Sequence, residues 1–427
     1  SVLGVATTRQ TPCAADPATG LVECSAWTVS ATIPTSTAWP SGVYLLRLVR
    51  EDTGKDWHVL VVVRDDASRS ALLYGVPFTD YQAYNAYGGK SLYDWQSSGA
   101  NTVAGSARAV QVSFDRPYAM VADPYHNDWY THTDEPMVLW LERMGYDVSY
   151  AANTDLETAP ALARNHGVYV AGGHDEYWSA AMRSAVTAAR DAGVDLFFPG
   201  GNDVYWKVRF AAGADGRAGR TMVCYKTTQG GPADPSGIPT GTWRDPAGAN
   251  QPENALLGQQ YVGDNDGVNF PFVVGAAEGQ DRVYRNTGLD VQAPGASTSL
   301  GTGLVGWEWN ARAANGQEPA GLKVLASSPV SGNILQDAGR TVAPGSTRAT
   351  MTRYAATSGA LVVNAGTNRW ARGLAVNALG DGEPLLAIQQ ITTNILSDMG
   401  AAPGTPHAGI VVSTAWTPAV VGQSPAS

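Results

Sequence analysis

Within the first 66 residues, three short runs are β-branched or alternate between apolar and polar positions. Three runs rich in β-branched residues, at 27–34, 42–51 and 57–66, are separated by short sequences containing Gly, Pro and Asp. Such alternation is typical of strands with one buried face. Residues 1–66 are therefore predicted to be the C-terminal part of a β-sandwich domain, which usually has about seven strands. Its upstream part is expected to be absent or to be a separate chain.

From about residue 67 the pattern changes, and short apolar runs alternate with segments of helical spacing. The runs predicted to be strands are 70–78, 146–151, 167–173, 194–202 and the first part of 358–374. The predicted helices are 134–146, 180–193, which Ser179 precedes as N-cap, and 383–400. This order predicts an α/β catalytic domain over 67–427 with a doubly wound, mostly parallel sheet of the amidotransferase or flavodoxin type.

Residues 210–345 interrupt this alternation. They are rich in Gly, Pro, Asn and Asp and have little helical periodicity. We predict a loop-rich insertion of long loops and short strands, placed as a cap over the functional site.

Composition narrows the classes of partner. Hydrophobic residues make up 44% of the chain and charged residues 15%, which indicates a folded protein with a large core. The net charge of -10 argues against nucleic acid, because proteins that bind phosphate backbones normally present a basic face. No apolar run approaches the roughly 18 residues that a membrane-spanning helix needs. Neither nucleic acid nor a membrane span is therefore expected, and the expected partner is a small molecule.

The three cysteines bear on the compartment. Cys13 and Cys24 flank a short polar loop containing Pro and Gly, and we predict a disulfide between them. Such a bond indicates an oxidising compartment, so a secreted protein is expected. Cys224 is interpreted as a buried apolar residue.

Polar residues follow several of the predicted strands. His174 and Glu176 come directly after the run at 167–173, and Asn202 ends the run at 194–202. Ligands of parallel sheets bind beyond the carboxyl ends of the strands, so these side chains are expected to converge. A His-x-Glu pair suits a metal ligand with a proton-transfer group, or an acid–base pair without metal. His126 and His132 are further possible ligands, with a solvated loop as the alternative.

Several common catalytic motifs are absent from the sequence. It has no GxSxG elbow, HExxH motif, paired CxxC motif, phosphate-binding loop or GxGxxG sequence. The 13 Trp and 18 Tyr, together with acids such as Asp175, Glu176 and Asp203, leave open a secreted glycoside hydrolase that uses two carboxylates. A carbohydrate-binding protein on the same scaffold is a further alternative.

Longer motifs resemble the large (beta) subunit of N,N-dimethylformamidase. They are QAYNAYGGKSLY at 82–93, SFDRPY at 113–118, GGHDEYWS at 172–179, FFPGGNDVYWKVR at 197–209 and the segment 358–374. The sequence at 39–48 also resembles the end of the β-sandwich domain of that family. The resemblance covers nearly the whole chain.

This resemblance implies a mononuclear ferric ion bound by two tyrosines and a glutamate. Carried over by motif, the ligands are Tyr84, Tyr118 and Glu176, while Tyr81 and Tyr87 compete with Tyr84 for its place. The pocket residues are His174 and Asn202. Phenolate and carboxylate oxygens are hard ligands, which suits Fe(III).

The implied reaction is hydrolysis of a C–N amide bond by metal-activated water. His174 would position the water or carry its proton, and Asn202 would bind the substrate or the developing oxyanion. Glu176 belongs to the catalytic set as a ligand. Because a secreted protein is an unexpected place for a small solvent amide, we expect a larger amide-containing substrate.

Overall fold

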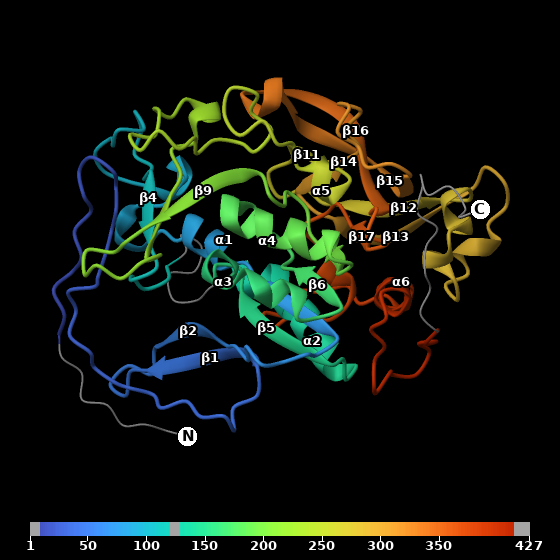
Figure 1. Cartoon of the computed structure of the whole chain (residues 1–427), viewed down its shortest axis with the longest axis horizontal. Helices are drawn as coiled ribbons and strands as arrows, with labels where there is room; N and C mark the ends of the chain where they lie inside the picture. The colour runs from blue at the N-terminus through green and yellow to red at the C-terminus, as the bar shows by residue number, and fades with distance from the viewer. Residues whose placement is uncertain (1–8, 120–128, 414–427) are drawn as a thin grey trace.

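The computed structural model describes residues 9–119 and 129–413, and over these it has seventeen strands and six α-helices. The largest unit is a nine-stranded sheet in the order β14-β11-β15-β16-β17-β8-β6-β3-β5 (Figure 1). In that order the strands are Glu308–Ala311, Gln260–Asp264, Lys323–Gln336, Thr341–Ala355, Leu361–Asn364, Asp195–Phe198, Val168–Ala171, Leu72–Val76 and Val148–Ala152.

The sheet is mixed, and the prediction of a doubly wound, mostly parallel α/β fold is wrong. Neighbours among β17, β8, β6, β3 and β5 pair in parallel, whereas every pairing among β14, β11, β15, β16 and β17 is antiparallel. Only 21% of the described residues are helical. Parallel pairing needs long crossovers, usually helices, while a hairpin needs only a short turn. The helix-poor segment between β11 and β16 therefore adds antiparallel strands to the sheet.

Helices cover both faces of the parallel part of the sheet. They are α1 (Phe78–Ala83), α2 (Glu135–Arg143), α3 (Asp155–Thr158), α4 (Ala180–Asp191), α5 (Asn254–Leu257) and α6 (Leu386–Asp398). Alternate residues of β6 enter different cores: Val170 packs in the cluster that contains residues of α2 and α6, and Tyr169 in the cluster that contains residues of α4. Ser179 caps α4 through the backbone N–H of Met182, as predicted.

Two smaller sheets lie beside the large one. The four-stranded sheet has the order β4 (Gln111–Ser113), β10 (Thr221–Val223), β9 (Trp206–Ala211) and β7 (Tyr177–Ser179). The other pairs β12 (Phe270–Gly275) with β13 (Ser297–Val305). Because β7 begins directly after Glu176 and pairs in parallel with β9, the four-stranded sheet fixes the loops that leave β6 and β8.

The N-terminal segment contributes one hairpin, β1 (Gly42–Val49) with β2 (Asp56–Val63), at the edge of the molecule (Figure 1). Two of the three strands predicted there are confirmed. The predicted strand at 27–34 is not formed, and these residues are irregular. This run ends in Pro34, and its polar alternate positions do not face a partner strand in the structure.

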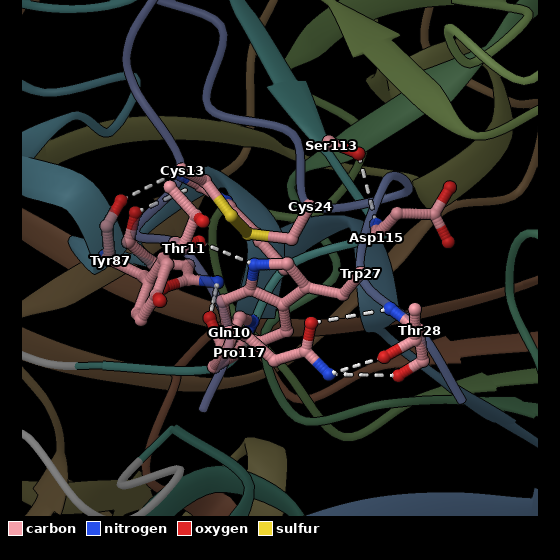
Figure 2. The surroundings of a disulfide bond; sticks show 12 residues. Gln10, Thr11, Cys13, Cys24, Trp27, Thr28, Tyr87, Ser113, Asp115 and Pro117 are labelled. Atoms are coloured by element: carbon pink, nitrogen blue, oxygen red, sulfur yellow. Dashed lines mark hydrogen bonds between the residues drawn. A yellow bond between two sulfur atoms is a disulfide. The ribbon is translucent and has the colours of Figure 1, made fainter. Parts of the chain in front are cut away.

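The predicted disulfide between Cys13 and Cys24 is confirmed (Figure 2). The ring it closes packs on the segment that follows α1: Val110 N–H donates to the Thr19 carbonyl at 2.8 Å, and Val103 N–H donates to the Ala18 carbonyl at 2.8 Å. Cys224 is buried and free, as predicted. None of the described helices is both long and apolar enough to cross a membrane.

Replacing both Cys13 and Cys24 by Ser is expected to lower the free energy of unfolding by about 2–3 kcal/mol, because the crosslink restricts the unfolded chain. Urea denaturation with and without a thiol reductant measures the effect. Wild type in reductant should match the double variant, and the variant should not respond to reductant. Equal stability of wild type and variant under oxidising conditions would contradict the prediction.

Candidate active site

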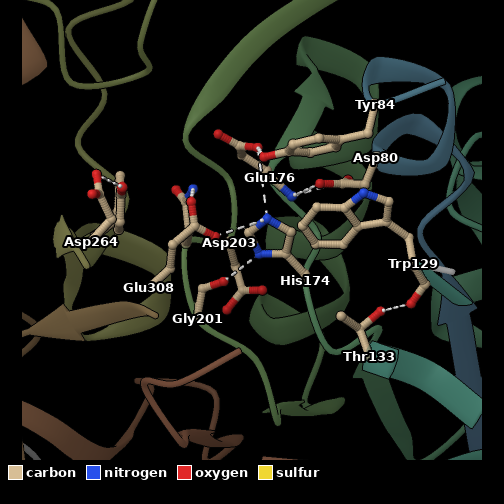
Figure 3. Close-up of polar contacts among 12 residues, drawn as sticks. Asp80, Tyr84, Trp129, Thr133, His174, Glu176, Gly201, Asp203, Asp264 and Glu308 are labelled. Atoms are coloured by element: carbon tan, nitrogen blue, oxygen red, sulfur yellow. Dashed lines mark hydrogen bonds and ion pairs between the residues drawn. The ribbon is translucent and has the colours of Figure 1, made fainter. Parts of the chain in front are cut away.

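The polar residues that follow β6 and β8 lie close together, as the sequence predicts. A Cβ at Gly173 would collide with the backbone oxygen of Thr133, and one at Gly201 would lie 2.8 Å from the backbone nitrogen of Asn368. Only glycine allows both loops to pass this close to neighbouring backbone. The loops thereby bring His174 against Gly201 in one buried site (Figure 3). Asn202, the next residue of the second loop, is buried as well.

His174 has a defined tautomer. Its Nδ1 lies 2.8 Å from the carbonyl oxygen of Gly201, which can only accept, so Nδ1 carries a proton. Its Nε2 faces two carboxylates, 3.1 Å from Glu308 Oε2 and 3.8 Å from Glu176 Oε2. Trp129 stacks on the imidazole at 5.0 Å and closes its other side.

Two phenol hydroxyls contact Glu176, and a third phenol contacts one of them. The hydroxyl of Tyr84 donates to Glu176 Oε2 at 3.1 Å, and that of Tyr93 lies 2.9 Å from the same oxygen. Tyr177 donates to the Tyr93 hydroxyl at 2.5 Å. Burial raises the pKa of Tyr84, and the Glu176 charge raises it further. A phenolate at Tyr84 therefore requires a cation close by.

Asp80, on α1, lies on the backbone side of Glu176. Both of its carboxylate oxygens accept from the Glu176 N–H at 3.1 Å. Burial raises the pKa of Asp80 well above its usual value, and the neighbouring charges of Asp175 and Glu176 add to the rise. Ligand atoms of Asp80, His174 and Glu176 all lie within 4.8 Å of one another, so this trio could hold a metal ion.

Asn202 connects the site to the far half of the large sheet. Its backbone is left-handed (φ 58°), a conformation that Asn tolerates well, and its Nδ2 donates to Glu308 Oε1 at 3.2 Å. Glu308 is the first residue of β14. Burial raises the pKa of Glu308, and the charges of Glu176 and Asp264 raise it further. Within the described residues, Glu308 Oε2 and Asn202 Oδ1 are buried without a hydrogen bond.

Lys226 is a buried cation beside the phenols. It is 1% exposed, and its Nζ lies 3.5 Å from the centroid of the Tyr93 ring and 4.7 Å from that of Trp206. Burial lowers the pKa of Lys226 to about 8, and the charge of Glu176 opposes the decrease. The ammonium is therefore still mostly protonated at neutral pH.

Among the described residues, Tyr118 makes no hydrogen bond with the residues of this group. It is buried in a different cluster and lines a groove of about 1230 Å³ beside β2. Burial raises its pKa, and the Gln82 side chain and Arg116 lower it. Within the described residues its hydroxyl makes no hydrogen bond with Tyr84 or Glu176. The role of Tyr118 as a ligand stays a prediction.

The remaining candidate residues are two histidines and two buried aspartates. His132 Nδ1 is 3.6 Å from Asp381 Oδ2, and His126 lies outside the described residues. Asp175 and Asp203, the acids considered for a glycoside hydrolase, are both fully buried. Asp175 accepts from the side-chain amide of Asn153 at 2.7 Å.

Four site residues were not predicted from the sequence: Asp80, Tyr93, Lys226 and Glu308. Tyr93 is the last residue of the motif at 82–93, so the family resemblance could have pointed to it. Glu308 lies in the segment 210–345, which was interpreted as long loops and short strands. Its only signal is a single acid between Trp307 and Trp309, directly after an apolar run.

A comparison with known protein families identifies a family for this chain. A family model described as "N,N-dimethylformamidase beta subunit-like, C-terminal" matches residues 2–382. No curated protein matches the chain in sequence. The matched span contains every residue of the site described above, and it covers most of the chain. The chain therefore belongs to the N,N-dimethylformamidase beta subunit-like family, whose name indicates a hydrolase of amide bonds.

Proposed function

We propose that the chain is a metal-dependent amidohydrolase that uses mononuclear ferric iron and water to cleave a C–N bond. The reaction class follows from the family. The metal and the assignment of roles to residues are our proposal.

The observation that carries the proposal is the arrangement around His174 Nε2. His174 Nε2 lies 3.1 Å from Glu308 Oε2 and 3.8 Å from Glu176 Oε2, and among the described residues neither Nε2 nor Glu308 Oε2 makes a hydrogen bond. Three negative or electron-rich groups this close in a buried site repel one another unless positive charge lies between them. A bound cation, with Tyr84 and Glu176 supplying oxygen ligands, relieves this repulsion.

The donor atoms favour a hard cation. Phenol and carboxylate oxygens surround the site, and its only cysteine neighbour, Cys224, has a thiol pKa that burial raises to about 11. Ferric iron bound there would polarise the amide carbonyl and lower the pKa of a water molecule. Tyr84 and Glu176 are the proposed ligands, and Tyr118 stays the third ligand that the family resemblance implies.

Glu308 is the proposed general base. Its Oε2 is buried and makes no hydrogen bond among the described residues, so this oxygen is available to accept a proton from water. It takes a proton from water as the new C–O bond forms and returns it to the amine as the C–N bond breaks. His174 orients the water, and Asn202 holds Glu308 through Nδ2.

Aromatic side chains around the site support a substrate larger than a one-carbon amide. Trp129 lies 4.2 Å from Tyr84 and 6.4 Å from Trp307, centroid to centroid, and Trp95, at 66% exposure, lies 6.5 Å from Tyr84. Such surfaces bind apolar or sugar-like groups. The disulfide supports an extracellular location.

Iron analysis together with a visible spectrum tests the proposal. We expect about one iron per chain and a broad visible band, because tyrosinate bound to ferric iron absorbs there. Hydrolysis of a panel of N-acyl amines, from one-carbon amides to N-acyl amino sugars, should depend on the iron. A colourless, metal-free protein that stays inactive on amides after reconstitution would contradict it.

A further inference from the structure

Lys226 occupies an unusual environment for a lysine. Its ammonium is 1% exposed and, among the described residues, makes no hydrogen bond. It lies instead against aromatic rings, 3.5 Å from the centroid of Tyr93, 4.7 Å from Trp206 and 5.4 Å from Tyr177. The backbone of Lys226 is left-handed (φ 51°, ψ 51°), which is costly for a residue with a Cβ. An apolar side chain would fill this space without burying a charge.

The ring closest to Lys226 belongs to a residue that contacts both proposed oxygen ligands. The Tyr93 hydroxyl lies 2.9 Å from Glu176 Oε2 and 2.8 Å from the Tyr84 hydroxyl. The Tyr93 ring also stacks on the Tyr84 ring, with centroids 4.3 Å apart. Tyr177 donates to the Tyr93 hydroxyl, so the proton of Tyr93 is free to point at Glu176 or Tyr84.

We propose that Lys226 is a positioning residue that acts through Tyr93 on Glu176 and Tyr84. A cation on the face of a phenol ring withdraws electron density from it and strengthens the hydrogen bond that its hydroxyl donates. In a buried site the charge is screened little, so this effect is large. Lys226 thus fixes the orientation of the two ligand side chains without contacting metal or substrate. The assignment of Glu176 and Tyr84 as ligands rests on the proposed function.

Such outer contacts are a general feature of metal sites. Groups that hydrogen-bond to ligands set their orientation, and losing one typically weakens metal binding roughly 10–100-fold. Here there are two successive contacts: the outer layer is the contact of Lys226 with the Tyr93 ring, and the inner layer is the contact of the Tyr93 hydroxyl with the ligands. Lys226→Met, which has nearly the same length and no charge, removes the outer layer. Tyr93→Phe removes the hydrogen bond and keeps the ring.

Lys207 offers a matched control. It is partly buried and, like Lys226, lies over an aromatic ring, 5.5 Å from the Trp243 centroid; its pKa is likewise lowered by burial. It lies on β9 against α4, on the wall of a different cavity that contains Trp243. Lys207→Met should therefore leave the site unchanged.

The first measurement uses metal-free protein labelled with ¹³C at the tyrosine Cζ. The signal that disappears in Tyr93→Phe identifies Tyr93. It should shift in Lys226→Met, stay in place in Lys207→Met, and return toward the wild-type position in Lys226→Arg, which restores a cation. Thermal melting of each variant checks that it folds. An unshifted Tyr93 signal in folded Lys226→Met would overturn the inference, whatever the metal result.

The second measurement uses the iron-loaded proteins. Lys226→Met and Tyr93→Phe should raise the iron dissociation constant roughly 10–100-fold and move the visible band to longer wavelength, because the Tyr84 phenolate loses a stabilising donor. Lys207→Met should do neither. Wild-type affinity and band position in Lys226→Met would overturn the inference and leave the proposed function intact. A wild-type protein that binds no iron would overturn the proposed function, while the NMR result would still decide the contact between Lys226 and Tyr93.

Discussion

Glu176→Gln is expected to lose iron, visible colour and amide hydrolysis together. The neutral amide keeps the shape of the side chain and can still accept hydrogen bonds from Tyr84 and Tyr93. It does not supply the negative charge that a ferric ion requires. A bound metal contributes several kcal/mol to transition-state stabilisation, and about 1.4 kcal/mol corresponds to a tenfold change in rate. Activity should therefore fall roughly a thousandfold or more.

Glu142→Gln is a suitable control for that experiment. Glu142 also accepts a hydrogen bond from a phenol, Tyr150, at 2.8 Å, but it lies on α2 outside the site. Iron content, absorbance and turnover are measured on both variants and on wild type. Full iron occupancy with wild-type turnover in Glu176→Gln would remove Glu176 from the ligand set.

Glu308→Gln should lower kcat roughly 100- to 10,000-fold while iron stays bound. Proton transfer by a positioned side chain contributes a factor of this size, and glutamine cannot take a proton from water. Iron should remain because Tyr84 and Glu176 are untouched. The hydrogen bond from Asn202 Nδ2 to Oε1 can also persist with Gln, so the pocket keeps its shape.

Steady-state kinetics on the iron-loaded variant, with metal content measured on the same sample, tests this role. Glu318→Gln, in an exposed ion pair with Arg312, is the control and should keep wild-type kcat. If Glu308→Gln keeps its iron and its kcat, the general base is another group. If it loses iron and colour as Glu176→Gln does, Glu308 is itself a ligand.

The sequence predicted local elements well and the complete sheet poorly. The helices α2, α4 and α6 and the parallel strands β3, β5, β6, β8 and β17 lie where apolar periodicity placed them. Periodicity within a segment does not encode which distant strand it will pair with. The long β15–β16 hairpin therefore went unrecognised in a segment rich in Gly and Pro, and the fold class was wrong.

The same distinction applies to the site. His174, Glu176 and Asn202 follow strands of a parallel sheet, so topology alone predicts that they converge. Glu308 approaches the same point from an antiparallel edge strand, which the predicted fold did not contain. Lys226 reaches the phenols from the turn that follows β10. Neither Glu308 nor Lys226 could be assigned to the site without the three-dimensional structure.

The site draws on residues from Asp80 to Glu308, and therefore on both halves of the nine-stranded sheet. Contacts of such long sequence separation form late and slowly in folding. The cation-binding geometry is therefore complete only when β14 has docked through β11 onto the rest of the sheet. A ligand that binds only the native state stabilises it by mass action, so iron uptake should report complete folding and protect the whole sheet against unfolding. In this chain, metal loading would serve as a test of conformational maturity.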